Sequence, residues 1–118
     1  MPGITESGKN SVEYRVLLSY YPKLSIAVRA DLTTLSGYLL ADRLITQENV
    51  SELTDQRHSL EAERANRLVE LVLLSVETNP KNYITFVGVL EKNRAHYKDT
   101  LNDLQRMYRD IEGEYFRS

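Results

Sequence analysis

Cysteine and tryptophan are absent from this chain of 118 residues. Without cysteine the chain can form no disulfide, no thiolate metal site and no cysteine nucleophile. That composition fits a reducing compartment, and we expect a cytoplasmic protein. Long apolar runs are missing as well. The longest, residues 71–74, is far shorter than the roughly 20 residues of a membrane-spanning helix, so we expect no membrane partner.

Neither sign of charge dominates the sequence. It has 15 lysines and arginines against 17 aspartates and glutamates, which gives a net charge of −2. A protein that coats nucleic-acid phosphates normally carries a basic excess, so we expect no nucleic-acid partner. Hydrophobic residues make up 42% and charged residues 27%, a balance typical of one folded domain rather than of a disordered tail.

Residues suited to chemistry are few and scattered. His58 and His96 fall in different predicted loops or helix starts, with no metal-ligand spacing between them. No glycine-rich loop precedes a helix in a way that would hold phosphate, and no nucleophile elbow is present. We therefore expect no catalytic residue, no metal site and no cofactor, and hence not an enzyme.

Apolar residues recur at spacings of three and four, and strict alternation persists nowhere, which predicts an all-α fold. We expect a flexible leader over residues 1–10, a helical bundle over residues 11–104, and an extension of the last helix over residues 105–118. The six predicted helices begin near Ser11, Asp31, Thr46, Leu60, Pro80 and Ala95.

Three local features refine this prediction. Pro22 lies inside the first apolar stripe, which includes Leu18, and predicts a kink or two short helices. Gly37 weakens the second predicted helix, which suggests a close packing contact there. Residues 68–76 are apolar around most of the helix circumference, so we expect the fourth helix to be the most buried.

Four segments, taken in order, resemble the caspase-recruitment domains. They are residues 39–49 (LLADRLITQEN), 64–71 (RANRLVEL), 83–90 (YITFVGVL) and 97–104 (YKDTLNDL). The resemblance implies the death fold, a six-helix antiparallel Greek-key bundle, here with a kinked first helix and an extended last one. The turn after the fourth helix lacks the lysine-glycine pair frequent in the family, which leaves a sister class such as the death or death-effector domains open.

The resemblance also implies a function without catalysis. Such a domain binds another caspase-recruitment domain, in an adaptor, a caspase or a sensor, and often binds itself in oligomers or filaments. This chain would then be an adaptor in apoptotic or innate-immune signalling. In the family, a basic face from the first and fourth helices contacts an acidic face from the second and third.

The charges of this sequence divide in a compatible way. The expected basic face comprises Arg29, Arg64 and Arg67, the last two on the exposed part of the fourth helix, and the expected acidic face comprises Asp42, Glu48, Glu52 and Asp55. The last three acids recur at i, i+4 and i+7, so they align along one helix side. Opposite faces on one chain permit head-to-tail contacts.

A simpler reading of the same charges is local pairing at the surface. Arg67 has Glu63 four residues before it and Glu70 three after it, and Arg64 has Glu61 three before it. Such intrahelical pairs are common and weak, and the acidic stripe alone is also typical of a solvated face.

The last predicted helix carries a heptad-like seam. Its members are Tyr97, Leu101, Leu104, Tyr108, Ile111 and Tyr115, spaced by 4, 3, 4, 3 and 4 residues. A helix over residues 95–116 would be roughly 33 Å long. Its second half either lies on the chain's own core or begins a coiled coil through Leu104, Tyr108, Ile111 and Tyr115. In the coiled-coil case, dimerisation through the tail is the alternative function.

Overall fold

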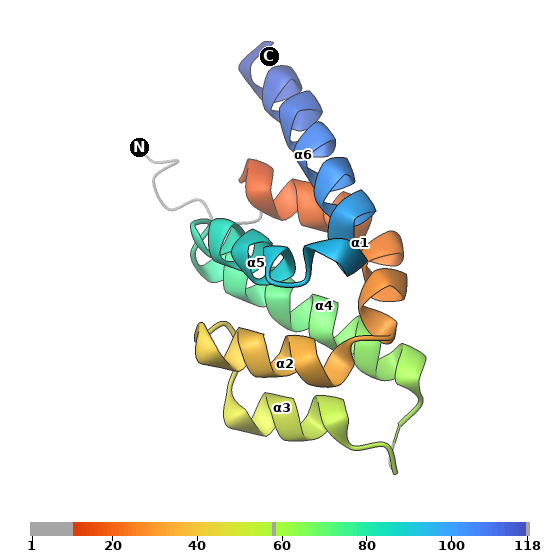
Figure 1. The fold of residues 1–118 in the computed structure, drawn as a ribbon. Helices are drawn as coiled ribbons and strands as arrows, with labels where there is room; N and C mark the ends of the chain where they lie inside the picture. Colours follow the sequence, from red (N-terminus) through yellow and green to blue (C-terminus); the bar gives the residue numbers. More distant parts are fainter. Residues whose placement is uncertain (1–10, 58, 118) are drawn as a thin grey trace.

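The chain folds into six helices without strands in the residues described by the structure, which is a computed structural model covering residues 11–57 and 59–117, with side chains to residue 114 (Figure 1). The helices are α1 (Val12–Arg29), α2 (Leu32–Ala41), α3 (Gln47–Thr54), α4 (Glu61–Thr78), α5 (Asn82–Glu91) and α6 (Arg94–Arg117). The prediction of an all-α fold with six helices is confirmed. The predicted leader, residues 1–10, lies outside the described residues, as does His58.

Two helices begin at side-chain caps that the sequence indicated. The Ser11 hydroxyl accepts from the backbone N–H of Tyr14 at 3.1 Å. Thr46 and Asn49 form a capping box, in which each side chain accepts from the other residue's backbone N–H, at 3.1 and 2.9 Å. These bonds satisfy N–H groups that have no partner within the helix, so they fix where α1 and α3 begin.

α1 is one continuous helix with Pro22 inside it, so of the two predicted alternatives, a kink or two short helices, the second is wrong. Its course bends midway in Figure 1, as expected of a helix that lacks one backbone N–H. Leu18, placed in the predicted core stripe, is 51% exposed, and Tyr20 is buried instead. The reason is the helix period, since the buried stripe of α1 turns away from residue 18.

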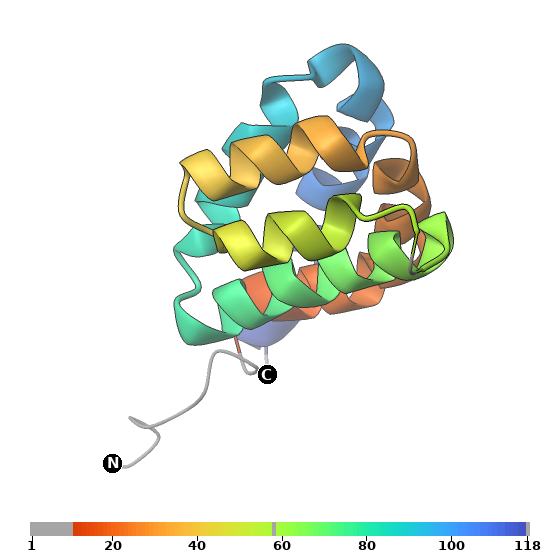
Figure 2. The ribbon, with the colours of Figure 1, turned by 90° about the horizontal axis from the view of Figure 1, so that it is seen from below.

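The core is built by packing helices that are distant in sequence. α1 packs mainly on α4 and α6, while α2 packs on α3 and α5, and α5 also packs on α6. Figure 2 shows α2 and α3 side by side, with α4 beside α3. Each helix contributes at least one side chain that is no more than 1% exposed, including Leu17, Leu39, Leu53, Leu68, Phe86 and Leu104.

α4 packs on α1, α2, α3 and α5 and contributes six buried side chains. It also has an exposed face, because Leu74 is 52% exposed and Leu71 is only half-buried. The expected close contact at Gly37 is wrong. Gly37 is exposed, and a Cβ built on it meets no atom within 4 Å. No close contact therefore explains the glycine in α2.

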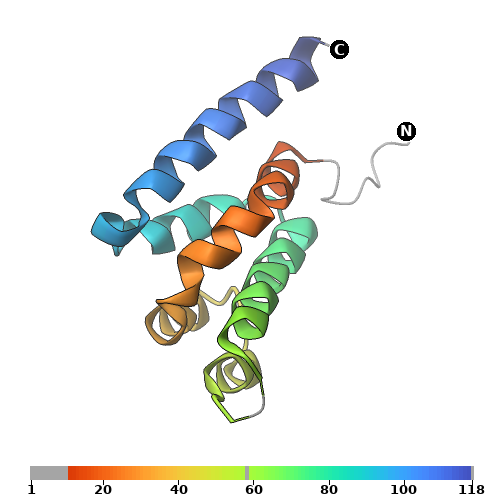
Figure 3. The ribbon, with the colours of Figure 1, turned by 90° about the vertical axis from the view of Figure 1, so that its right-hand side faces the viewer.

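α6 spans nearly the predicted range, residues 95–116, and extends past the other helices at its C-terminal end (Figure 3). Its first turn is interrupted at Tyr97, where φ is −103° and ψ is 15°. Tyr108 and Ile111 are half-buried against the core, and the Tyr108 ring lies 5.5 Å from the Tyr83 ring. This part of the seam packs within the chain, while the side chain of Tyr115 is outside the described residues.

Candidate interaction surfaces

Arg29 and Arg64, two members of the expected basic face, line one surface depression. Arg29 is the last residue of α1, and Arg64 lies in the first turn of α4. The depression has a volume of about 550 Å³ and also includes Thr33 and Thr34 at the start of α2. Arg29 is exposed, and no ion pair or hydrogen bond from its guanidinium occurs within the part of the chain that the structure describes.

Arg64 is half-buried, so its expected place on an exposed part of α4 is wrong. Its Nη1 donates to the carbonyl oxygen of Leu53 at 3.1 Å, and its Nε is buried with no partner among the described residues. Leu53 lies in the last turn of α3, where carbonyls lack helical partners and the helix dipole is negative. Arg64 therefore joins the start of α4 to the end of α3.

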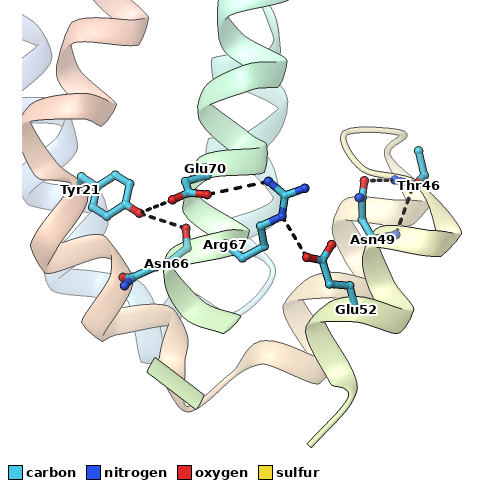
Figure 4. Close-up of polar contacts among 7 residues, drawn as sticks. All are labelled: Tyr21, Thr46, Asn49, Glu52, Asn66, Arg67 and Glu70. Atoms are coloured by element: carbon cyan, nitrogen blue, oxygen red, sulfur yellow. Dashed lines mark hydrogen bonds and ion pairs between the residues drawn. The ribbon is translucent and has the colours of Figure 1, made fainter. Parts of the chain in front are cut away.

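Arg67 links the expected basic and acidic faces within one molecule. Its Nε lies 3.1 Å from Oε2 of Glu52 on α3, and its Nη1 lies 3.8 Å from Oε1 of Glu70 (Figure 4). Glu70 in turn accepts a hydrogen bond from the Tyr21 hydroxyl at 3.2 Å. These contacts connect α3, α4 and α1, and they include the local pairing with Glu70 that the spacing allowed.

The expected acidic residues fall into two groups. Asp42 and Glu48 lie where α2 ends and α3 begins. Asp55 lies at the opposite end of α3, where its carboxylate accepts from the Arg57 backbone N–H at 3.0 Å. Glu52 is between them and is paired with Arg67. Glu48, Glu52 and the C-cap Asp55 thus follow one another along α3 without sharing one environment.

The two acids at the α2–α3 turn also differ. The Asp42 carboxylate lies 3.7 Å from Nζ of Lys92, which sits 4.9 Å from the centroid of the Tyr38 ring. Glu48 is exposed, and its carboxylate has no hydrogen bond or ion pair within the described ranges. Glu48 is therefore the expected acidic residue most available to a partner.

Tyrosine–carboxylate bonds between α6 and the N-terminal third of the chain were not predicted. Tyr20 donates to Asp103 at 2.8 Å, Tyr97 donates to Asp31 at 2.8 Å, and Tyr108 donates to Glu13. The sequence carried a partial signal, because Tyr97 and Tyr108 fall on the apolar stripe of the last helix while bearing a polar hydroxyl.

Each of these three tyrosine hydroxyls has a pKa above the ordinary value of 10.0. Burial, with a smaller contribution from the hydrogen bond to Asp103, raises the pKa of Tyr20 to about 12. The bond to Glu13, followed by burial, raises the pKa of Tyr108 to about 12. Burial first and Asp31 second raise the pKa of Tyr97 strongly. Each hydroxyl therefore stays a hydrogen-bond donor through the neutral pH range.

The described residues contain no group of three or more histidine, aspartate or glutamate side chains able to hold a metal ion. Within the same residues, no helix combines the length and hydropathy of a bilayer span. His96 is exposed in the first turn of α6, and its Nε2 donates to the Ala27 carbonyl oxygen at 2.9 Å.

Compared with known proteins, the chain matches no family model, no curated protein and no solved structure.

Proposed function

We propose that this chain is a homotypic interaction domain of the death-fold superfamily, of the caspase-recruitment type, that assembles through opposite charges. One observation carries the proposal. Arg29 lies where α1 meets α2, and Glu48 lies at the other end of the α2–α3 pair (Figure 1). Both residues are exposed, so each is available to the opposite charge on another molecule.

The helix arrangement supports the Greek-key part of the proposal. α1 makes its main contacts with α4 and α6, and its contacts with its sequence neighbour α2 are slight. Such packing requires connections that cross between layers, whereas a simple up-and-down bundle places consecutive helices side by side. The bent α1 and the long α6 agree with the expected variations of this fold.

Opposite charges at the two ends of the α2–α3 pair favour head-to-tail contacts. The contact proposed here places Arg29 and the adjoining depression of one molecule against Glu48 of the next. Because donor and acceptor surfaces differ, each molecule keeps one unused surface, and the contact propagates into a ring or a filament. Such charge pairs mainly raise specificity and the rate of encounter.

The partner that fits these surfaces is another domain of the same type, in an adaptor, a caspase or a sensor, or a second copy of this chain. The role that follows is that of a cytoplasmic adaptor in apoptotic or innate-immune signalling. Arg67 and Glu52 contribute to this role by joining α3 to α4, since each is already paired with the other.

Charge reversal tests the proposal. Arg29→Glu and Glu48→Lys should each weaken self-association about tenfold, which corresponds to about 1.4 kcal/mol. Mixing the two variants should restore assembly, because each then supplies the charge that the other lacks. Sedimentation velocity and negative-stain electron microscopy at about 50 and 300 mM salt measure the effect, which should shrink as screening increases.

Matched controls are Arg15→Glu and Asp110→Lys, which reverse exposed charges on α1 and α6 outside the proposed contact. Both should assemble like the wild type. If Arg29→Glu and Glu48→Lys behave like these controls, or if their mixture stays dissociated, the proposed contact is wrong.

A further inference from the structure

The depression where α1 meets α2 is lined by an exposed acid as well as by the exposed Arg29. Glu61, in the first turn of α4, lines it and is exposed. Its carboxylate has no hydrogen bond or ion pair in residues 11–57 and 59–114. The other two charged residues described in its lining, Asp31 and Arg64, are opposite in sign, and each already has a hydrogen-bond partner within the chain. One cation, Arg29, and one anion, Glu61, are therefore left for a partner.

The turn between α2 and α3 also presents one cation and one anion. Arg43 and Glu48 are exposed, and neither side chain has a hydrogen bond or ion pair with the residues that the structure describes. Asp42, the third charged residue of the turn, is paired with Lys92. Figure 1 shows this turn at one end of the α2–α3 pair, while α1 meets α2 at the other end. The two ends thus carry matching sets of charges.

The backbone of Arg43 indicates that its side chain acts outside the fold. Its φ is 63°, in the left-handed region where a residue with a Cβ is strained and glycine is not. Within the described chain the exposed guanidinium makes no bond that would offset this cost. Strain of this kind is typical of functional positions. A partner that binds the side chain explains why an arginine occupies a position suited to glycine.

We propose that the α2–α3 turn of one copy of this chain binds in the depression of the next copy through two ion pairs. One is the contact between Arg29 and Glu48 proposed above, on which this inference rests. The other has the opposite polarity and joins Glu61 to Arg43 of the next copy. A turn bound in the reverse orientation would set Arg43 against Arg29. Like charges opposed in this way disfavour that orientation, so the two pairs together fix how the turn docks.

This pattern favours a second copy of the chain over a partner with a purely acidic face. An acidic face would pair with Arg29 but would also set a carboxylate against Glu61, which weakens such a complex. The α2–α3 turn supplies both signs, and every copy has both the turn and the depression, so the contact repeats head to tail. Leu60 lines the same depression and is 69% exposed. A bound turn covers it and removes apolar area from water.

Charge reversal tests the second pair. Arg43→Glu and Glu61→Arg should each raise the dissociation constant of self-association about tenfold, because each sets like charges against one another. The double variant carries the pair reversed and should return to within about threefold of the wild type. Sedimentation velocity of the full chain over about 10–500 µM measures these constants. Arg15→Glu and Asp110→Lys are the matched controls, exposed and outside both surfaces, and should assemble like the wild type.

Arg43→Gly separates binding from folding. The substitution relieves the left-handed strain, so the variant should resist urea better than the wild type. Its self-association should nevertheless weaken about threefold, because the guanidinium is lost. A residue that matters only for the fold would change stability and leave assembly unaltered. Circular dichroism checks that the charge-reversal variants are folded.

The outcomes distinguish this pair from the contact on which it rests. The second pair is wrong if Arg43→Glu, Glu61→Arg and Arg43→Gly assemble like the controls, or if the double variant is no better than the single ones. In that case Arg29→Glu and Glu48→Lys still weaken assembly if the first contact is right. A wild type that stays monomeric at about 500 µM overturns both pairs.

Discussion

Arg43 is the one non-glycine residue with positive φ in the described part of the chain, at 63°. It follows the C-cap Asp42, and the turn closes through two backbone bonds of 2.9 Å, from Arg43 to the Leu40 carbonyl and from Leu44 to the Leu39 carbonyl. This is the Schellman arrangement, which favours glycine at the left-handed position. Sequence patterns do not predict this left-handed position, because an arginine gives no signal for positive φ.

Arg43→Gly should therefore stabilise the fold by about 1 kcal/mol, since a left-handed conformation costs a side-chain-bearing residue roughly that much. Urea denaturation measures the change in the free energy of unfolding. Arg43→Ala is the control, because alanine keeps the Cβ that causes the strain and should leave stability within about 0.5 kcal/mol. Equal effects of the two substitutions would show that the arginine side chain, not the backbone, matters.

Gly37 offers the opposite substitution. It lies inside α2, is exposed, and has open space where a Cβ would be added. Gly37→Ala should raise the free energy of unfolding by about 0.5–1 kcal/mol through helix propensity alone. Thermal and urea unfolding measure this gain. A loss of stability would mean that a neighbouring group approaches α2 more closely than the structure shows.

At the scale of the helices, short-range sequence signals predicted where helices begin, but not which side chains meet between helices. Ser11 and Thr46 cap α1 and α3 through bonds within three residues, so the sequence alone revealed them. The role of Arg64 was missed because its partner is the Leu53 carbonyl, in a different helix. Arg67 was expected on a basic face, but α3 brings Glu52 to it. Contacts between helices depend on packing, which periodicity does not specify.

The start of α6 depends on one such contact. Tyr97 is fully buried and donates to the Asp31 carboxylate at 2.8 Å, while its backbone departs from helical geometry. Tyr97→Phe should reduce the free energy of unfolding by about 1–2 kcal/mol, because it leaves a carboxylate at the α1–α2 junction without its donor.

Tyr21→Phe is the matched comparison for Tyr97→Phe. The Tyr21 hydroxyl donates to Glu70 at the exposed α1–α4 surface, where water can replace it. Its removal should cost less than about 0.5 kcal/mol. Equal losses in the two variants, measured by urea denaturation, would contradict the role assigned to the Tyr97–Asp31 bond.

Across the whole molecule, three tyrosine–carboxylate bonds hold the long last helix to the N-terminal third of the chain. They run in antiparallel register, from Glu13 with Tyr108, through Tyr20 with Asp103, to Asp31 with Tyr97. α6 is thus joined to α1 and to the α1–α2 junction at three points, from its first turn at Tyr97 to Tyr108. These bonds explain how α6 can extend past the other helices while its residues Tyr108 and Ile111 still pack on the core.

These bonds predict how stability depends on alkaline pH. The folded pKa of Tyr20 is raised to about 12, above its ordinary value of 10.0, so above pH 10 the unfolded chain loses this proton first. Stability is therefore fully present below pH 10 and falls between pH 10 and 12. Each tyrosine so held contributes a slope of up to about 1.4 kcal/mol per pH unit. The pKa of Tyr108 is raised to about 12 as well, so the slopes add.

Urea denaturation between pH 8 and 12 measures this loss, and Tyr20→Phe isolates one contribution. The variant should be less stable than the wild type at pH 8, because the hydrogen bond to Asp103 is gone. Its stability should decline less steeply above pH 10, so the two curves should converge by pH 12. Lysine titration affects both proteins alike and cancels in the difference. Parallel curves would show that the neutral hydroxyl of Tyr20 does not stabilise the junction between α1 and α6.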